Sequence, residues 1–450
     1  MNRKIGPLLI LTLCLTALAA LGFAQQRIRK QIPKTHFVTG PTFRIVDLSM
    51  ASADRSIRQA SDQVLVKFKS DISIQTRIMT LSHFRSNAIR HIPQIDVYQV
   101  RIPSDLSVDE MLVLLQQNPD VEYAEPNPVC YTCVSPNDTL FQYQYALYND
   151  GQVIGGIPGS PTGKLRADIK ATEGWEETKG SDSIVVAVLD SGLDFDHPDM
   201  VDIAVSRGRD IVNDDDDALD DLGHGTYISS IIAANSNNGE GIAGITWNCK
   251  ILPVKVIAED GSGLYAWMIE AIIWAADQGA HVINMSIGGD ATSQALEDAL
   301  KYAYQKGVVI VASAGNDDGP VIYPAAYDDY VLAVAATDYN DNRTNWSNSG
   351  SQIDVAAPGE RIIGCYPVWA LTGGTLPYVF GYGTSPSAAY VSGLAALIVS
   401  IKPWLTPNEV MDIIRYTADD INVTEHPGFD EFIGHGRINM EKAVVPIKIK

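Results

Sequence analysis

The sequence predicts an α/β protein in which a mostly parallel central sheet lies between two layers of helices, preceded by a small α+β unit. From Ser183 onward, apolar runs rich in β-branched residues alternate with helical patterns, as a parallel sheet covered on both faces requires. The charge distribution also divides the chain. Residues 26–128 hold 13 Lys and Arg against 11 Asp and Glu, whereas residues 129–450 hold 18 against 43. Two folded units are therefore expected within the 450 residues.

The N-terminal segment has the pattern of an export signal. Two basic residues precede an uncharged apolar stretch that contains the small residues Gly22 and Ala24 at its end. We expect residues 1–24 to be a signal peptide and the mature protein to be secreted or held in the cell envelope, with no membrane association after cleavage. An uncleaved membrane anchor is the alternative, because the stretch is nearly long enough to span a bilayer.

The small α+β unit is expected at residues 61–128, after a polar and irregular linker at residues 25–60. Its predicted elements are strands at 64–69 and 96–102, a helix at 107–117 and a last strand within 118–127. One face of this helix is apolar and consists of Val108, Met111, Leu112 and Leu115.

The second unit, residues 129–450, carries the alternating pattern. Its predicted strands are 184–189, 251–257, 282–286, 308–313 and 330–336. Its predicted helices are 223–235, 266–278, 293–306 and 385–402. Because ligands of such sheets bind beyond the carboxyl ends of the strands, polar residues at those ends are the first candidates for a site.

Composition limits the classes of partner. The second unit is strongly acidic and has no basic stripe, which excludes nucleic acid and leaves small cations, protein substrates or plain solubility. After removal of the signal, four cysteines remain, Cys130, Cys133, Cys249 and Cys365. Disulfides are compatible with an exported protein, but the sequence leaves their pairing open. A single C-x-x-C is a weak indication of zinc or redox chemistry.

Three polar residues follow strands or begin helices in a way that suits nucleophilic catalysis. Asp190 ends the first strand of the second unit, His224 begins a helix in Gly-His-Gly-Thr, and Ser385 begins another in Gly-Thr-Ser. A serine hydroxyl needs an imidazole to take its proton, and the imidazole needs a carboxylate to fix its tautomer. The sequence therefore predicts an Asp-His-Ser triad.

The motifs around these residues resemble those of subtilisin-like serine proteases. They include VAVLDSGLDFDHPD, GHGTYISSIIAA, VASAGN, DVAAPG, GTS and GHGRINMEKA, and the chain order Asp, His, Ser is that of the family. The resemblance implies a three-layer subtilisin-like fold and a secreted endopeptidase that hydrolyses proteins through an acyl-enzyme. It also implies that Asn316 donates to the oxyanion together with the backbone N–H of Ser385.

The α+β unit resembles the prodomains of bacterial subtilisin-like proteases, from its VLVKFK strand to its closing NPDVEYAEPN. The resemblance implies a prodomain that acts as an intramolecular inhibitor and is removed by autoprocessing. A permanent accessory domain is the alternative.

Substrate recognition is placed by the same resemblance. Gly261-Ser262-Gly263 and Ser286-Ile287-Gly288 resemble the two edge segments that hold a substrate backbone as an added strand. Asp317 and Ile322 resemble positions of the primary specificity pocket. Our hypothesis is that Ile322 shortens this pocket and that Asp317 tolerates a basic group at its mouth.

A structural calcium ion is also implied by the resemblance. Asp199 and Asn238 match its side-chain ligands, and the backbone of Glu240 and Ile242 would complete the shell. The acidic run Asp214–Asp217, with Asp220 and Asp221, is a hypothetical second calcium site, for which a solvated acidic loop is the alternative.

The sequence departs from the family pattern at several places. Ser385 is followed by Pro386-Ser-Ala-Ala389, whereas the family has Met next and Pro at the fourth position. Pro386 is acceptable at a first helical position, because its missing N–H has no partner there. Tyr227 and Ser230 replace the His and Gly that are common in the family after the catalytic histidine. Tyr382 stands where the family frequently has Asn or Ser. These departures motivate the alternative of a weak or inactive homologue that serves as a binding or scaffold protein. An esterase is excluded, because no Gly-x-Ser-x-Gly elbow surrounds Ser385.

Overall fold

The computed structural model describes residues 59–128, 134–156, 159–370 and 376–445. Cys130 and Cys133 and the predicted signal peptide lie outside them. The chain divides into two compact units, one within residues 50–134 and one from residue 135 onward.

The smaller unit is an antiparallel sheet with two helices, in the strand order β2-β3-β1-β4. Its elements are β1 Gln59–Phe68, α2 Ile74–His83, β2 Asn87–Ile92, β3 Val97–Arg101, α3 Val108–Gln116 and β4 Val121–Pro128. Ser107 caps α3 in a capping box with Glu110, which satisfies two backbone donors of its first turn. Val108, Met111 and Leu115 of α3 are buried and Leu112 packs at the edge of the same core, so the predicted apolar face is confirmed.

The larger unit is built on a seven-stranded parallel sheet in the order β11-β10-β9-β8-β5-β7-β6. Its strands are β5 Val185–Asp190, β6 Arg209–Asp210, β7 Lys250–Lys255, β8 Val282–Met285, β9 Val309–Ser313, β10 Val331–Thr337 and β11 Ile353–Pro358. A separate hairpin consists of β12 Ile362–Cys365 and β13 Tyr378–Gly381. The sheet strands are almost wholly buried, because helices cover both faces.

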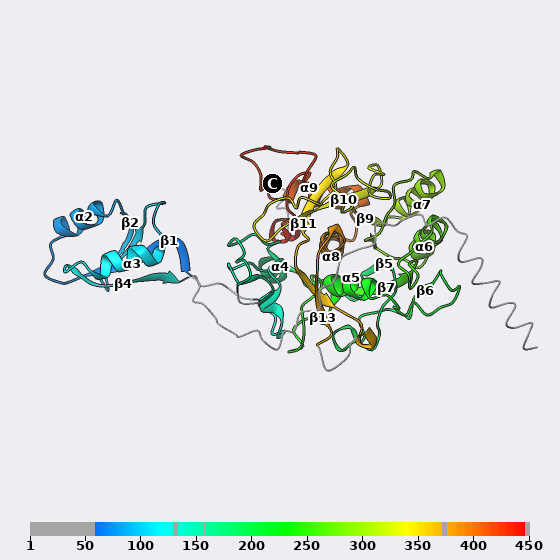
Figure 1. Cartoon of the computed structure of the whole chain (residues 1–450), viewed down its shortest axis with the longest axis horizontal. Helices are drawn as coiled ribbons and strands as arrows, with labels where there is room; N and C mark the ends of the chain where they lie inside the picture. The colour runs from blue at the N-terminus through cyan, green and yellow to red at the C-terminus, as the bar shows by residue number, and fades with distance from the viewer. Residues whose placement is uncertain (1–58, 129–133, 157–158, 371–375, 446–450) are drawn as a thin grey trace, which may run out of the picture. The chain divides into compact units, whose positions relative to one another are not determined.

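Helices form the outer two layers (Figure 1). Those of the larger unit are α4 Ala171–Glu177, α5 His224–Ala233, α6 Tyr265–Asp277, α7 Gln294–Gln305, α8 Thr384–Ile401, α9 Pro407–Thr417 and α10 Met440–Val444. Short 3₁₀ turns lie at Phe141–Tyr143, Ile154–Gly156, Pro198–Met200 and Val368–Ala370. The pair α6 and α7 packs on one face of the sheet, and α5 and α8 pack on the other. The predicted three-layer fold class is therefore confirmed.

Helix α8 is the central helix of this core. By length and composition it could cross a membrane, yet 83% of it is buried inside the protein. Its apolar sequence is therefore explained by contacts with β8, β9, β10, α5 and α9. This burial fixes the N-terminal end of α8, where Ser385 lies.

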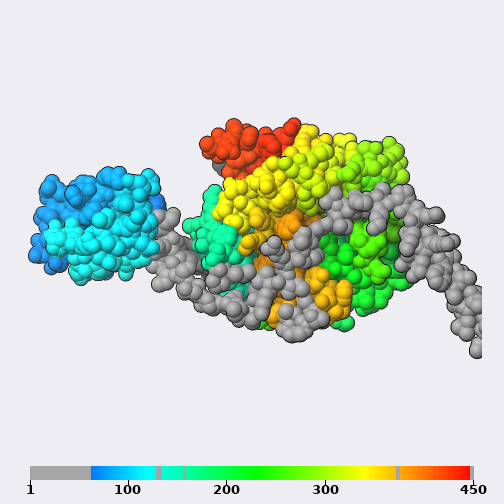
Figure 2. All heavy atoms as spheres, in the orientation of Figure 1, coloured from blue at the N-terminus to red at the C-terminus, as the bar shows by residue number. Residues whose placement is uncertain are grey.

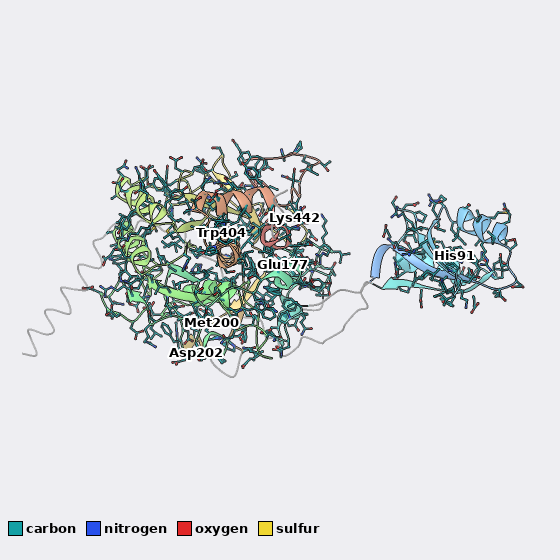
Figure 3. All side chains as sticks on the ribbon, turned by 180° about the vertical axis from the view of Figure 1, so that it is seen from behind. His91, Glu177, Met200, Asp202, Trp404 and Lys442 are labelled. Atoms are coloured by element: carbon teal, nitrogen blue, oxygen red, sulfur yellow. The ribbon has the colours of Figure 1, made fainter. Side chains whose placement is uncertain are left out.

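The C-terminal segment closes the larger unit. On α4, a Cβ at Gly174 would lie 2.3 Å from Cγ of Met440 on α10, so the two helices meet at a glycine. The two helices can be found in Figure 3 by the labels of Glu177 on α4 and Lys442 on α10. In Figure 2 the red C-terminal segment lies beside yellow residues, in agreement with the ion pair between Arg437 and Asp341.

The predicted strands and helices of both units are present, with ends shifted by a few residues. The sequence patterns did not identify α2, β2, α4, β6, β11, the β12–β13 hairpin, α9 or α10. Most of these are short or lie at the edges of the sheets, but α2 and α9 have 10 and 11 residues.

Candidate active site

Asp190 is the last residue of β5, the strand at the centre of the candidate site. It is fully buried, and its carboxylate accepts a hydrogen bond from Nδ1 of His224, at 2.7 and 2.9 Å from its two oxygens. Its backbone carbonyl accepts from Val256 and Ile257, which follow the neighbouring strand β7. The carboxylate is thus held at the end of the sheet and turned toward the helix that carries the imidazole.

His224 is the first residue of α5. It follows Gly223, whose φ of 101° lies in the left-handed region that favours glycine. Gly225 allows close approach to the turn after β5, because a Cβ there would lie 2.2 Å from the carbonyl oxygen of Gly192. Burial by itself lowers the pKa of His224. The charge and hydrogen bond of Asp190, with a smaller effect of Asp220, outweigh burial, so that the pKa of His224 is raised. Its Nε2 is buried and has no hydrogen-bond partner among the described residues.

Ser385 is the second residue of α8 and is almost fully buried. Its Oγ donates to the carbonyl oxygen of Ser286 at 3.1 Å, and Oγ of Ser286 donates back to the carbonyl oxygen of Ser385 at 2.9 Å. Val188 of β5 pairs with Asn284 of β8, so Ser286 lies level with Asp190 two residues further along. Ser385 is therefore at the same edge of the sheet as Asp190, with its hydroxyl bonded to Ser286 rather than to His224.

Pro386 occupies the third position of α8 and not the first, because the helix begins at Thr384. The expected position was therefore wrong, but the reasoning still holds, since none of the first four N–H groups of a helix has an intrahelical partner. From Ser385 through Ala389 the helix is continuous.

Asn316 lies in the loop after β9 and faces the start of α8. Its Oδ1 accepts hydrogen bonds from the backbone N–H of Thr384 at 2.8 Å and from the Thr384 hydroxyl at 3.0 Å. These donors fix which end of the amide is the oxygen. Its Nδ2 and Oδ1 both lie close to Gly383, 3.3 and 3.5 Å from the place of a Cβ there. The amide group of Asn316 therefore lies beside the turn immediately before Ser385.

The two predicted edge segments lie on either side of Asp190. Gly261-Ser262-Gly263 follows β7, and Ser286-Ile287-Gly288 follows β8, while β5 lies between these two strands. Gly261 has a φ of 78° in a turn closed by the N–H of Ala258 and the carbonyl of Ser262. Both segments are therefore at the carboxyl ends of the strands, the edge where such sheets bind ligands.

Ile322 fills space next to one of these segments. Its side chain is buried, and a Cβ at Gly288 would lie 2.6 Å from its Cδ1. A Cβ at Gly315 would lie 3.3 Å from its Cγ2. Asp317 is exposed on the adjoining loop, where its N–H donates to the side chain of Asn348. Ile322 therefore reduces the room between the two glycines, and Asp317 adds a carboxylate at the surface.

The unusual Tyr227 and Ser230 are explained by the β12–β13 hairpin. A Cβ at Gly364 would lie 2.4 Å from the Tyr227 ring, and one at Gly381 would lie 2.7 Å from its hydroxyl. The hydroxyl donates to the carbonyl of Ile362, and Oγ of Ser230 accepts from the N–H of Cys365. Both substitutions thus join α5 to the hairpin that leads to Ser385. Tyr382 packs against Trp346, with ring centroids 5.9 Å apart.

The candidate calcium ligands gather around Asp199, which is fully buried. Its carboxylate accepts from Nδ2 of Asn238 at 2.9 Å and from the N–H of Ile242 at 2.8 Å, while Glu240 donates its N–H to Oδ1 of Asn238. Burial, with a contribution from the charge of Asp138, raises the pKa of Asp199 to about 6. The structure therefore brings Asp199, Asn238, Glu240 and Ile242 into one place.

Asp138 is a ligand candidate that the sequence analysis missed. It is buried, burial raises its pKa, and its Oδ2 accepts from the N–H of Asn237 at 2.7 Å. Its Oδ1 is buried and has no partner in the part of the chain that the structure describes. A buried carboxylate oxygen without a donor, next to Asp199, fits a calcium ion, which prefers hard oxygen ligands. No local motif marks Asp138, because it lies 61 residues before Asp199 in the sequence.

Two arginines pair with three of the four aspartates of the acidic run. Arg209 pairs with Asp214 and Asp216, and Arg207 binds Asp217 through two nitrogens at 2.8 and 3.0 Å. Within the described ranges no three His, Cys, Asp or Glu side chains form a metal cluster, either in this loop or around Asp199. The arginine pairs favour the alternative of a solvated acidic loop over a second calcium ion.

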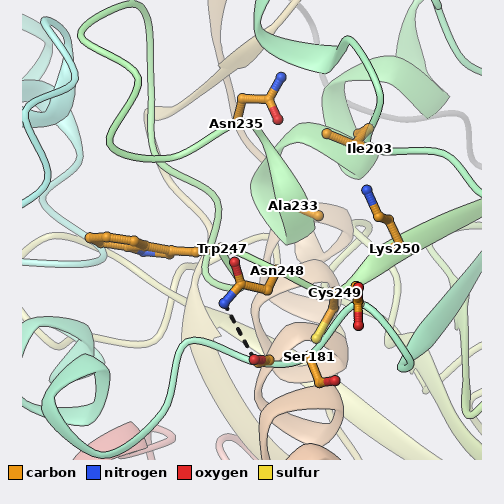
Figure 4. A pocket seen from close by; sticks show the side chains of 10 residues that line it. Ser181, Ile203, Ala233, Asn235, Trp247, Asn248, Cys249 and Lys250 are labelled. Atoms are coloured by element: carbon orange, nitrogen blue, oxygen red, sulfur yellow. Dashed lines mark hydrogen bonds between the residues drawn. The ribbon is translucent and has the colours of Figure 1, made fainter.

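Two further reactive groups in the described residues are cysteine thiols. Cys249 and Cys365 are buried free thiols, and burial raises the pKa of Cys249 to about 11. Cys249 lines a depression of about 390 Å³ together with Ser181, Trp247 and Lys250 (Figure 4). None of the candidate catalytic residues lines it.

Comparisons with known proteins identify the relatives of the chain. A model described as the subtilase family matches residues 181–436, and a model of the fervidolysin N-terminal prodomain matches residues 51–127. The chain is 36% identical over 388 residues to a thermophilic serine proteinase of Bacillus sp. strain AK1, covering 85% of this chain and 87% of that protein. It is 32% identical over 429 residues to the halolysin-like extracellular serine protease Nep of Natrialba magadii, covering 92% and 73%. Among solved structures, proteases from Pseudoalteromonas arctica are similar with a TM-score of 0.59 and 30% identity, over 69% of this chain and 98% of theirs.

Proposed function

The chain belongs to the subtilase family and is a subtilisin-like serine protease with an N-terminal prodomain; we propose that Asp190, His224 and Ser385 are its catalytic triad. The observation that carries this proposal is the buried hydrogen bond between Asp190 and His224 at the sheet edge where Ser385 lies. The carboxylate holds Nδ1 of the imidazole, which leaves Nε2 as the atom that can accept a proton.

The proposed reaction begins when the Ser385 hydroxyl turns from Ser286 toward Nε2 of His224. As Oγ attacks the scissile carbonyl, its proton moves to Nε2, and Asp190 stabilises the imidazolium. His224 then gives this proton to the leaving amine, which yields the acyl-enzyme. A water molecule, deprotonated by the same nitrogen, releases the acid and restores Ser385.

The developing oxyanion would be bound by Nδ2 of Asn316 and by the N–H of Ser385. Oδ1 of Asn316 is held by Thr384, so the amide nitrogen is already oriented before substrate binds. The N–H of Ser385 belongs to the first turn of α8 and needs no intrahelical acceptor. Fixed donors of this kind stabilise the charge without reorganisation during the reaction.

We further propose that the edge segments at Gly261–Gly263 and Ser286–Gly288 bind the substrate backbone. Ile322 would restrict the pocket for the residue before the cleaved bond to small side chains. Asp317 at the surface would tolerate a basic group there.

We also propose the domain boundaries of the chain. A signal peptide occupies residues 1–24, a linker residues 25–60, a prodomain residues 61–128 and the peptidase residues 129–450.

Secretion and maturation are proposed from the apolar N-terminal segment and from the relatives, one of which is named as an extracellular protease. The prodomain would inhibit the peptidase until Ser385 cuts the chain between the two units. A structural calcium ion held by Asp138, Asp199, Asn238 and the backbone of Glu240 and Ile242 would stabilise the loop before β7 by neutralising two buried carboxylates.

The alternative is an inactive homologue that binds proteins. It is favoured by one observation, the bond of the Ser385 hydroxyl to Ser286 instead of His224. N-terminal sequencing, mass measurement and casein hydrolysis of the wild type and Ser385→Ala, both in calcium, distinguish the two. Ser387→Ala is the matched control, because this serine lies in the same turn and bonds only backbone carbonyls.

If the triad is correct, the wild type and Ser387→Ala lose about the first 130 residues and digest casein, whereas Ser385→Ala stays at full length. A wild type that remains intact and inert in calcium would favour the binding protein or an outside activating protease.

A further inference from the structure

We propose that Lys255 and Asp221 form an ion pair that positions the Asp190–His224 dyad and sets the acid limit of catalysis. This inference rests on the proposed triad. It concerns a lysine buried beside the catalytic aspartate and a carboxylate that we first assigned to a possible metal site.

Lys255 is the last residue of β7 and stands directly opposite Asp190 of β5 in the register of the sheet. Its side chain is 1% exposed. Nζ donates to the carbonyl of Ser191 at 2.9 Å, to the carbonyl of Ile257 at 2.8 Å and to Oδ1 of Asp221 at 2.5 Å. All three ammonium protons therefore have acceptors.

The two carbonyls bound by Lys255 flank the backbone of Asp190. Ser191 follows Asp190 directly, and the N–H of Ile257 donates to the Asp190 carbonyl at 3.1 Å. The ammonium thus joins the end of β5 to the segment after β7. A change in its position would move the backbone that carries the catalytic carboxylate.

Asp221 connects this cation to the loop that enters α5. Its neighbour Asp220 accepts from Oγ of Ser191, from the N–H of Gly223 and from Thr226. Asp220 is thus satisfied by neutral donors, while Asp221 takes the charge of Lys255. The two aspartates together attach the loop immediately before His224 to the strand that ends at Asp190.

The pair also balances charge around His224. The charged groups near this imidazole are the carboxylates of Asp190 and Asp220, and behind them the Lys255–Asp221 pair. Tyr366 is a further titratable group, and its ring packs on Gly223, the residue before His224. A buried ammonium whose partner is removed stays uncompensated, because the low-dielectric interior screens it poorly. If Asp221 loses its charge, the remaining Lys255 ammonium disfavours the protonated form of His224. If Lys255 loses its charge, the remaining Asp221 carboxylate favours that form.

The two single variants should therefore shift catalysis in opposite directions. In Asp221→Asn the free ammonium lowers the pKa of His224, so the acid limb of kcat/KM moves to lower pH. In Lys255→Met the free carboxylate raises this pKa, and the limb moves to higher pH. We expect each shift to be roughly 0.3 to 1 pH unit, the size that Coulomb's law gives for unit charges beyond direct contact at an effective dielectric constant between about 20 and 80. The double variant should return near the wild-type limb.

The experiment measures kcat/KM between pH 5 and 10 with a peptide p-nitroanilide on the mature enzyme. Asp217→Asn is the matched control, because its side chain has a similar exposure, 48% against 43% for Asp221, and pairs with Arg207 rather than Lys255. This control should leave the acid limb in place. Wild type and Ser385→Ala are compared first, which tests the triad separately from the pair.

Limbs that do not move, or that move in the same direction in both single variants, would overturn the proposal and reduce the pair to a structural contact. If Lys255→Met does not fold, the acid limb of kcat/KM in Asp221→Asn is compared with that in Asp217→Asn. A limb that moves to lower pH only in Asp221→Asn supports the proposal, and equal limbs overturn it. If the wild type has no activity that depends on Ser385, the proposed function fails, and the pair is tested by NMR titration of the His224 ring in the same variants.

Discussion

Replacing Ile322 by glycine should convert a shallow specificity pocket into a deep one. Ile322 is 5% exposed and lies against Gly288, which belongs to one of the proposed substrate segments, and against Gly315. A large side chain before the cleaved bond would have to occupy the volume that the isoleucine fills. We therefore expect the wild type to prefer alanine over phenylalanine at this position of the substrate.

The size of the change follows from the area that a phenyl ring can bury. Full burial of an aromatic or large aliphatic side chain contributes about 1.5 to 3 kcal/mol, and about 1.4 kcal/mol corresponds to a factor of ten. In Ile322→Gly, the ratio of kcat/KM for phenylalanine over alanine should thus rise roughly 10- to 150-fold. The variant should also lose about 2 to 5 kcal/mol of stability, because an internal side chain is removed.

The assay uses peptide p-nitroanilides that differ only in the residue before the cleaved bond. Val321→Ala is the control, because Val321 is also buried but faces Gly350 rather than the substrate segments. It should lose stability without a change in the substrate ratio. A wild type that already cleaves after phenylalanine ten times better than after alanine would refute this reading of Ile322.

Other variants test the packing and the proposed calcium site, each in a Ser385→Ala background that prevents self-digestion. Arg415→Met leaves the buried Asp354 without its cation. Burial already raises the pKa of Asp354 to about 6 against the opposing charge of Arg415, so its charged form costs stability above that pH, and the cost is relieved as the pH falls. Denaturant titration should show a loss of about 3 to 5 kcal/mol at pH 8 and clearly less at pH 5; an equal loss at both values would contradict this assignment. Tyr227→Phe should lose about 1 kcal/mol through its bond to Ile362, and a neutral result by the same titration would show that water replaces the hydroxyl. EDTA should lower the melting temperature of the parent chain and have little effect on Asp138→Asn, measured by differential scanning calorimetry; equal responses would remove Asp138 from the calcium site.

Much of the fold and part of the site could be predicted because the signals are local. The run that ends in Asp190 is apolar through its length, as a strand buried on both faces must be, and the motif around His224 places it at a helix start. The face of α3 follows from a 3.6-residue period in the sequence. Elements with weak periodicity, such as β2 with its wholly exposed residues, gave no such signal.

The sequence by itself determined which residues end strands and begin helices, because backbone preference and hydrophobic period act over a few neighbours. Only the tertiary structure decided which of these residues meet. Asp138 reaches Asp199, Ile322 fills the space beside Gly288, and Lys255 finds Asp221, across separations of 61, 34 and 34 residues. Such contacts depend on strand order, register and close packing, which the whole core fixes together. For that reason Asp221, which the sequence analysis placed in a hypothetical second calcium site, is in the folded protein the partner of the buried Lys255.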